Sequence, residues 1–148
     1  MTAPPTELSI CIISWNTKAL TRNCLTSLFE DPRSDGWQVI VVDNDSADAS
    51  ADMVAAEFPV VELVRSDRNL GFAGGNNLAM AQARGSNLLL LNSDTRVAVG
   101  ALGHLIDHLA QAGDVGAVGP RLVNGVGQLE LSCGREPGLT PEIVHKLL

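Results

Sequence analysis

The amino-acid sequence predicts an α/β fold, in which helices flank a mostly parallel sheet. Apolar runs of strand length alternate with stretches whose apolar residues recur at helical spacing. Three of the apolar runs stop abruptly at polar residues. One run, Leu88 to Leu91, consists of four leucines, which is typical of a strand buried on both faces of a parallel sheet. A chain of 148 residues is long enough for one such domain, expected over residues 1–148.

The expected strands are uninterrupted apolar runs bounded by turn-forming residues. They cover 8–13, 37–42, 60–64, 88–91 and 115–118. A hairpin around Asn124-Gly125 is expected within 121–132.

The expected helices follow caps and end at breakers. The first begins after Asn16 or Thr17 and carries Leu20, Cys24 and Leu28; the second begins after Asp45 or Ser46 and ends before Pro59. The third runs from about residue 76 to 84, with Gly85 as its stop. The fourth covers 97–111, and Thr140-Pro141 opens a last turn.

The composition excludes several classes of partner. Ten basic and 17 acidic residues give a net charge of −7, which argues against nucleic acid or an anionic membrane surface as a ligand. Phosphate can still be bound locally by backbone N–H groups or through a metal ion. With 45% hydrophobic and 18% charged residues, the chain is expected to be globular.

The cysteines and the N-terminus indicate a reduced, cytoplasmic setting. Three widely spaced cysteines form no zinc pattern, and Cys11 and Cys24 are expected in the core. No signal-peptide pattern and no apolar run of membrane-spanning length are present, so no transmembrane segment is expected.

Three polar segments follow apolar strands: 14–16, 43–45 and 92–94. If the strands are parallel, these segments share the carboxyl edge of the sheet, where ligands of open α/β sheets bind. The glycine- and asparagine-rich segment 69–77 is expected there as a loop. Amides and carboxylates suit a base and ribose, and Asp94 is a hard oxygen ligand suited to Mg²⁺ or Mn²⁺.

The segments LSICIISWN, VIVVDNDSADAS, RNLGFAGGNN, LLLLNSDT and VGAVGPRL, in this order, resemble a family 2 glycosyltransferase of GT-A fold. The similarity is closest to the bacterial rhamnosyltransferase-like branch and runs from about Leu8 to Cys133. It implies a GT-A, Rossmann-like nucleotide-sugar-binding domain that is short at its C-terminus.

The resemblance also implies roles for particular residues. Asp94 is implied as the metal ligand in the DxD position, where Asn92 replaces the first acid. The residues implied to bind the nucleotide sugar are Ser14, Asn16, Asp43, Asn44, Asn69, Gly71, Asn76, Asn92, Ser93 and Asp94.

The implied reaction is inverting, metal-assisted transfer of a sugar from a nucleoside diphosphate sugar to a hydroxyl group. The implied donor is dTDP- or UDP-linked, with rhamnose as the first candidate. The implied acceptor is a cell-envelope polysaccharide or a lipid-linked saccharide. Such an enzyme would be cytoplasmic or peripheral at the inner face of the plasma membrane, and a homo-oligomer is compatible with the sequence.

No catalytic base is found, because neither Glu130 nor Glu136 matches a family motif, and the half that binds the acceptor is expected to be absent. The alternative is a truncated, non-catalytic module of the same fold that binds a nucleotide or a partner chain. A nucleotidyltransferase is disfavoured, since the loop SWNTK holds only Lys18 against a triphosphate.

Purely structural alternatives remain for individual residues. Asp94, Ser93 or Thr95 could instead cap the following helix. His104 and His108 are expected on a solvated helix face. Trp15 and Trp37 are expected to be packing residues rather than stacking platforms, although Trp15 borders the expected site.

Overall fold

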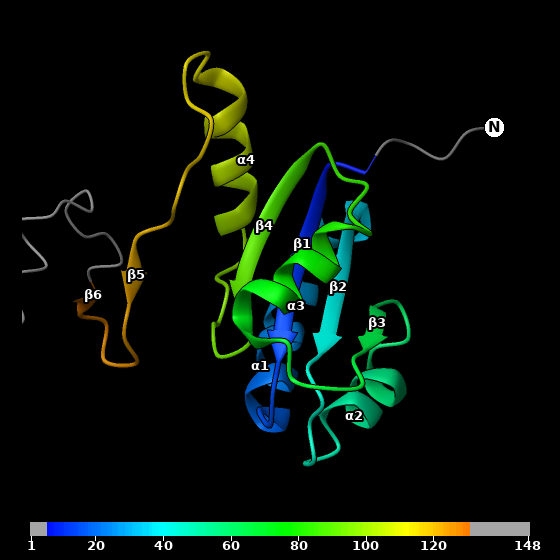
Figure 1. Cartoon of the computed structure of the whole chain (residues 1–148). Helices are drawn as coiled ribbons and strands as arrows, with labels where there is room; N and C mark the ends of the chain where they lie inside the picture. The colour runs from blue at the N-terminus through cyan, green and yellow to red at the C-terminus, as the bar shows by residue number, and fades with distance from the viewer. Residues whose placement is uncertain (1–5, 131–148) are drawn as a thin grey trace, which may run out of the picture. The chain divides into compact units, whose positions relative to one another are not determined.

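The computed structural model describes residues 6–130 of the chain (Figure 1). The chain divides into two compact units, Met1–Asp114 and Val115–Leu148. Each unit is described separately below.

The first unit is built on a four-stranded parallel sheet, so the predicted α/β fold is confirmed. Its strands, in spatial order β3-β2-β1-β4, are Glu62–Arg65 (β3), Trp37–Asp43 (β2), Leu8–Ser14 (β1) and Asn87–Asn92 (β4). The strands β1 and β2 are each one residue longer than predicted, and their last residues, Ser14 and Asp43, are register partners. The first two polar segments therefore begin inside the sheet.

Helices cover both faces of this sheet. Their bounds are Lys18–Phe29 (α1), Ser50–Glu57 (α2), Gly71–Met80 (α3) and Ala101–Gln111 (α4), with a short 3₁₀ turn at Ser34–Gly36. The main core lies between one face of the sheet and α1, α2 and α4, where Ile10, Val41 and Leu28 are fully buried. The smaller core on the other face joins Cys11, Ile40, Val42 and Ala79 of α3. Figure 1 shows α3 in front of the sheet.

The helix α3 differs from its prediction, because it begins five residues earlier and takes in most of the expected loop 69–77. Its glycines allow close packing. A Cβ on Gly75 would lie 2.9 Å from Ile13 Cγ2 of β1. Gly85 is likewise not a helix stop: a Cβ there would lie 2.5 Å from Ser9 N. Both glycines let backbone approach β1.

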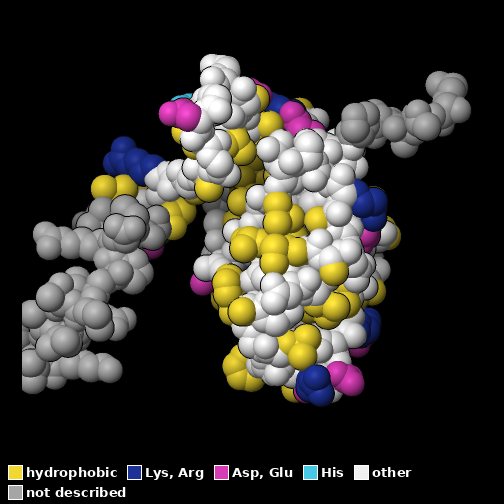
Figure 2. Space-filling view, turned by 45° about the horizontal axis from the view of Figure 1, so that its top comes forward, with side chains coloured by type: hydrophobic (Ala, Val, Ile, Leu, Met, Phe, Trp, Pro, Cys, Tyr) yellow, Lys and Arg dark blue, Asp and Glu magenta, His cyan; other side chains and the backbone are white. Residues whose placement is uncertain are grey.

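The leucine strand is not buried on both faces, and that prediction was wrong. Leu88 and Leu90 are each 47% exposed, whereas Leu89 and Leu91 pack against the main core. The reason is that β4 is an edge strand of the four-stranded sheet and α3 packs on β1 and β2. Figure 2 looks at the molecule from the α3 side and shows hydrophobic side chains gathered on this face.

The predicted cap position was right for α1, at Thr17, and wrong for α2, where Asp45 or Ser46 was expected. Thr17 is the N-cap of α1 and Ala49 that of α2, and neither side chain makes a capping hydrogen bond. The Asp48 carboxylate accepts hydrogen bonds from the backbone N–H of Lys18 and of Ser50 at those two termini. Asp48 belongs to the loop that leads into α2, so only its cap on α1 comes from a different loop, which local sequence patterns do not reveal.

The second unit contains the predicted hairpin, with antiparallel strands Leu122–Val123 (β5) and Leu129–Glu130 (β6) around Asn124. The strand expected at 115–118 is absent, because no described strand pairs with it and Gly116 lowers its strand propensity. Cys133, Glu136 and the turn at Thr140-Pro141 lie outside the described residues.

Three smaller expectations are confirmed. Cys11 and Cys24 are buried, Trp37 is 8% exposed, and His104 and His108 lie on the exposed face of α4. Within residues 6–130, no helix has the length and apolarity needed to cross a membrane.

Candidate functional site

The carboxyl edge of the sheet brings three chain segments together. Asn44 N–H donates to the carbonyl oxygen of Ser14 at 2.8 Å, and Ser66 N–H donates to that of Asp43 at 2.9 Å. The turns that follow β1, β2 and β3 therefore meet at one place. This is the edge at which parallel α/β sheets bind their ligands.

Asp43 ends β2 and is 5% exposed. Its Oδ2 accepts a hydrogen bond from Ser46 N–H at 3.1 Å, whereas its Oδ1 is buried with no partner in the structure. The side chain lines a pocket of about 220 Å³, together with Asp45, Ser46, Ala49, Ala51, Asp52, Arg65 and Ser66. A buried carboxylate oxygen without a donor is costly, so this pocket suits a ligand that supplies an N–H or O–H group.

Asn44 is 2% exposed and holds the segment before α3. Its Oδ1 accepts from Leu70 N–H at 2.8 Å, and its Nδ2 donates to Asn69 Oδ1 at 2.9 Å and to the Gly71 carbonyl at 3.3 Å. Gly71 has φ +71°, a conformation that glycine adopts without strain. Asn44 thus positions Asn69 and Gly71 beside the edge.

Asn16 joins the β1–α1 and β2–α2 loops. Its backbone N–H donates to Ser46 Oγ at 3.0 Å, and its Oδ1 accepts from Ala47 N–H at 2.8 Å. Three non-glycine residues here adopt left-handed backbone conformations: Asn16 (φ 54°), Asp45 (φ 65°) and Ala49 (φ 60°). Such strain collects at functional sites when surrounding contacts maintain it.

Asp48 is a residue of this edge that the sequence interpretation missed. It accepts from Lys18 N–H at 2.8 Å, from Ser50 N–H at 3.0 Å and from the Ser50 hydroxyl. Burial acts to raise the pKa of Asp48, but these hydrogen bonds outweigh it and the pKa is lowered. The sequence shows a carboxylate five residues after the Asp that ends β2, which is a local signal. The contact with Lys18, 30 positions away, has no such signal.

Trp15 does not pack in the core, and that prediction was wrong. It directly follows β1 and is 54% exposed. The neighbouring Ser14, the last residue of β1, is fully buried. The Ser14 hydroxyl bonds inward, with Thr17 Oγ1 at 3.1 Å and Thr21 Oγ1 at 3.0 Å.

Asp94 lies in the segment that leads from β4 to α4. Hydrogen bonds attach this segment along α1 and beyond it: Ser93 Oγ to Thr17 Oγ1 at 3.2 Å, Val97 N–H to Ser27 Oγ at 3.0 Å, and Gly100 N–H to Asp31 Oδ2 at 2.7 Å. Asp94 is therefore not a helix cap, since α4 begins only at Ala101 and Gly100 is its N-cap.

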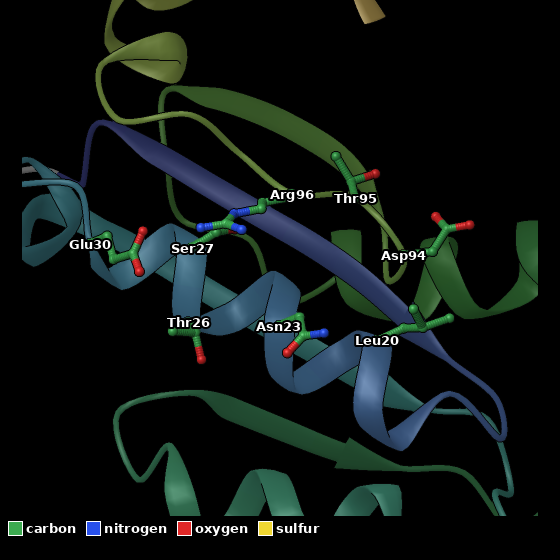
Figure 3. Close-up of a pocket in the computed structure, with 8 residues that line it drawn as sticks. All are labelled: Leu20, Asn23, Thr26, Ser27, Glu30, Asp94, Thr95 and Arg96. Carbon is green, nitrogen blue, oxygen red and sulfur yellow. The ribbon is translucent and has the colours of Figure 1, made fainter. Parts of the chain in front are cut away.

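An open groove of about 320 Å³ separates this segment from α1. Figure 3 shows Asp94 and Leu20 at one end of the groove and Glu30 at the other. Its lining also includes Asn23, Thr26, Ser27, Thr95 and Arg96. No residue is shared between this groove and the pocket that Asp43 lines.

The remaining predicted site residues differ in exposure. Asn92 is exposed, as Asp94 is, and Ser93 is 9% exposed. Asn76 is 4% exposed, and its Nδ2 donates to the Phe72 carbonyl at 2.9 Å within α3.

Burial and the negative charge of Asp94 raise the pKa of Cys24 to about 12, so this thiol stays protonated.

The donor set around Asp94 fits a metal ion only in part. In the described part of the chain, no group of three or more His, Cys, Asp or Glu side chains could hold a metal. Mg²⁺ is nevertheless commonly bound by one or two carboxylates together with substrate phosphates and waters. An exposed Asp94 fits an ion that shares its ligands with a diphosphate.

Comparisons with known proteins agree with this geometry. The model of the family described as "Glycosyl transferase family 2" matches residues 9–140. The chain is 36% identical over 91 residues to "Uncharacterized glycosyltransferase YfnE" of Bacillus subtilis, covering 60% of this chain and 23% of that protein. It is 40% identical over 77 residues to "Succinoglycan biosynthesis protein ExoO" of Rhizobium meliloti, covering 51% and 22%.

Among solved structures, the mannosyltransferase PcManGT from Pyrobaculum calidifontis, in complex with GDP-Man and Mn²⁺, superposes with a TM-score of 0.64 at 26% identity. The match covers 70% of this chain and 32% of that one. The chain thus spans about a quarter to a third of the length of the proteins it matches. The GT-A-like arrangement expected from the sequence is confirmed.

A parallel sheet whose carboxyl edge carries a buried acceptor, and a family match over nearly the whole chain, lead to one identification: this chain belongs to glycosyl transferase family 2.

Proposed function

We propose that this chain forms the donor-binding part of an enzyme that transfers a sugar from a dTDP- or UDP-linked donor to a hydroxyl group. The observation that carries the proposal is Asp43, which lines a pocket at the carboxyl edge and whose Oδ1 is buried without a partner. Family membership supports the class of reaction.

Asp43 is assigned to bind the nucleotide base of the donor. A pyrimidine N3–H donates one hydrogen bond to a carboxylate oxygen, which is what Asp43 Oδ1 lacks. The exposed indole of Trp15, at the end of the neighbouring strand, offers an aromatic face for stacking on the same base. Asn16, Asn44, Asn69 and Gly71 form the surrounding loops.

Asp94 is assigned to a divalent metal ion, Mn²⁺ or Mg²⁺, that arrives with the diphosphate. A bound metal ion there would stabilise the negative charge of the leaving nucleoside diphosphate. The structurally similar mannosyltransferase PcManGT is described in complex with GDP-Man and Mn²⁺, which supports this assignment. Asn92 and Ser93 directly precede Asp94 and contribute neutral oxygen atoms to the same segment.

Further parts of the proposal rest on the resemblance to the rhamnosyltransferase-like branch. They are rhamnose as the sugar, inversion at the anomeric carbon, a cell-envelope polysaccharide or lipid-linked acceptor, and a site of action in the cytoplasm or at the inner membrane face. The relative ExoO carries polysaccharide biosynthesis in its name, which supports this class of acceptor. The base that deprotonates the acceptor is assigned to a part of the enzyme other than residues 6–130.

The test is calorimetric titration of UDP, dTDP and GDP, with and without Mn²⁺, on three proteins: wild type, Asp43→Asn and Asp94→Ala. We expect wild type to bind one of them saturably. Asp43→Asn should weaken binding by roughly 10- to 100-fold with or without metal, because a hydrogen bond to a charged group contributes about 1.5–3 kcal/mol. Asp94→Ala should remove only the gain in affinity that Mn²⁺ provides.

His108→Ala serves as the control, since His108 is exposed on α4 and lines neither pocket. It should bind as wild type does. A folded wild-type protein that binds none of the three nucleotides would contradict the proposal. Binding that is insensitive to Asp43→Asn would contradict the assignment of the base.

A further inference from the structure

The turn between β2 and α2 contains two non-glycine residues in strained backbone conformations. Asp45 and Ala49 both adopt left-handed conformations, at φ 65° and φ 60°. Alanine has no side-chain group that could compensate for this conformation, unlike asparagine or aspartate. Contacts from outside the turn must therefore maintain its shape.

Asp48, a residue of the turn, makes such a contact with the start of α1. One carboxylate oxygen accepts from Lys18 N–H at the start of α1, at 2.8 Å. The other accepts from Ser50 N–H at 3.0 Å and from the Ser50 hydroxyl at the start of α2. A single side chain thus occupies the positive ends of two helices and ties them to one turn.

This tie reaches the proposed base pocket through two neighbours of Asp48. Ser46 N–H donates to Asp43 Oδ2 and fixes that carboxylate at 3.1 Å, while Ser46 and Ala49 both line the pocket. A change in the path of the turn would rotate the Asp43 carboxylate. Its second oxygen, which has no partner of its own, would then change position.

We infer that Asp48 is a positioning residue of the nucleotide site, which orients Asp43 by holding the strained turn between the first turns of α1 and α2. This inference rests on the function proposed above. Asp48 itself touches no substrate in this scheme, and its effect on binding passes through Asp43.

Asp31 provides a matched control. Its carboxylate also accepts two backbone N–H groups, from Arg33 at 2.9 Å and from Gly100 at 2.7 Å, and it is 3% exposed. It follows the C-terminal end of α1, at the opposite end of the sheet from Asp43. Asp31→Asn should therefore lower stability as Asp48→Asn does, without disturbing the base pocket.

The experiment compares Asp48→Asn, Asp31→Asn and wild type by thermal unfolding and by titration at a temperature at which all three are folded. The probes are the best-binding nucleotide among UDP, dTDP and GDP, and its monophosphate. Asp48→Asn should weaken both probes by the same factor, at least about tenfold. Both titrations are made without a metal ion, because Asp31 accepts a hydrogen bond from Gly100 of the segment that bears Asp94. Asp31→Asn should then leave both affinities within about twofold of wild type, since it lies far from the pocket.

Two further variants keep the inference falsifiable. Ser50→Ala removes one of the three donors to Asp48 and should weaken binding less than Asp48→Asn, which provides a test if that variant does not fold. In an Asp43→Asn background, Asp48→Asn should cause little further loss of affinity, because both changes act through one carboxylate.

The outcomes separate the two ideas. If wild type binds and Asp43→Asn weakens binding, but Asp48→Asn behaves like Asp31→Asn, the positioning role is refuted and the proposed function stands. Additive losses in the double variant also refute it. If wild type binds no nucleotide, both ideas fail.

Discussion

The two ends of the sheet use buried polar residues in opposite ways. At the amino-terminal end, Gln38 is 5% exposed: its Oε1 accepts from Ser9 Oγ at 2.6 Å and from Arg84 N–H at 2.9 Å, and its Nε2 donates to Glu62 at 2.9 Å. At the carboxyl-terminal end, Asp43 is equally buried, but one of its oxygens has no partner. The contrast separates a network whose hydrogen bonds are satisfied within the chain from a carboxylate that retains an unused acceptor.

A second unpartnered buried atom, Trp37 Nε1, sharpens this comparison. It belongs to a neutral indole packed in the main core at the start of β2. Asp43 Oδ1 belongs to a carboxylate that lines a pocket. An unsatisfied group therefore indicates a site only where it also borders accessible space.

The largest effect on stability is expected at the amino-terminal end. Gln38→Ala removes the acceptor of Ser9 Oγ and Arg84 N–H, and should lower the free energy of unfolding by about 3 kcal/mol, because several buried groups lose their partners together. Nucleotide affinity, measured by titration on the folded variant, should not change. Urea unfolding gives the stability.

Gln82→Ala is the control for that prediction, since Gln82 is exposed and only its backbone carbonyl takes part in the network. It should change stability by no more than about 0.5 kcal/mol. A Gln38→Ala protein of unchanged stability would show that the network is not a structural one.

Acid should lower the stability of the protein through carboxylates at both ends of the sheet. Hydrogen bonds from Arg33 N–H and Gly100 N–H lower the pKa of Asp31, and the pKa of Asp48 is lowered as described above. Each folded-state pKa lies below the unfolded value, so the stabilisation is complete above the unfolded pKa and is lost as pH falls through the folded pKa. The free energy of unfolding should therefore decrease below about pH 4.

Urea titrations between pH 7 and pH 3 measure this decrease. The slope with pH should be shallower in Asp31→Asn and in Asp48→Asn than in wild type, since each variant has one such group fewer. Equal slopes in all three proteins would mean that these carboxylates do not govern the acid response.

The smallest effect concerns the strained turn. Ala49→Gly should raise the free energy of unfolding by about 0.5 kcal/mol, because the left-handed conformation costs alanine about 1–2 kcal/mol and glycine offsets part of this gain through its greater unfolded-state entropy. Thermal unfolding measures the change. Ala55→Gly, at an exposed position inside α2, should instead lower stability by about 1 kcal/mol. Destabilisation by both would indicate that residue 49 is not strained.

The sequence predicted the sheet edge at which the candidate site lies, but not the burial and hydrogen-bond partners of its residues. Apolar runs that stop at Ser14 and Asp43 are local signals, and they predicted the strand ends to within one residue. The contact between Asp48 and Lys18 joins residues 30 positions apart, which local patterns do not contain. The buried, unpartnered state of Asp43 Oδ1 is a property of the folded structure alone.

The wrong predictions have a similar origin. The exposure of Leu88 and Leu90 depends on strand order, which places β4 at an edge, rather than on the leucines themselves. The glycines and asparagines before residue 76 predict a loop, because they allow left-handed backbone conformations. Gly75 instead serves the contact of α3 with Ile13, a packing constraint between elements far apart in the chain.

The strand order also predicts the order in which the strands pair during folding. Leu8 pairs with Trp37 on one side and with Asn87 on the other, so β1 can find β2 long before β4 has been synthesised. Pairs that are close in the chain form faster than distant ones. On the ribosome, we therefore expect the strand that ends at Asp43 to join the sheet first, and the segment that bears Asp94 to complete the site last.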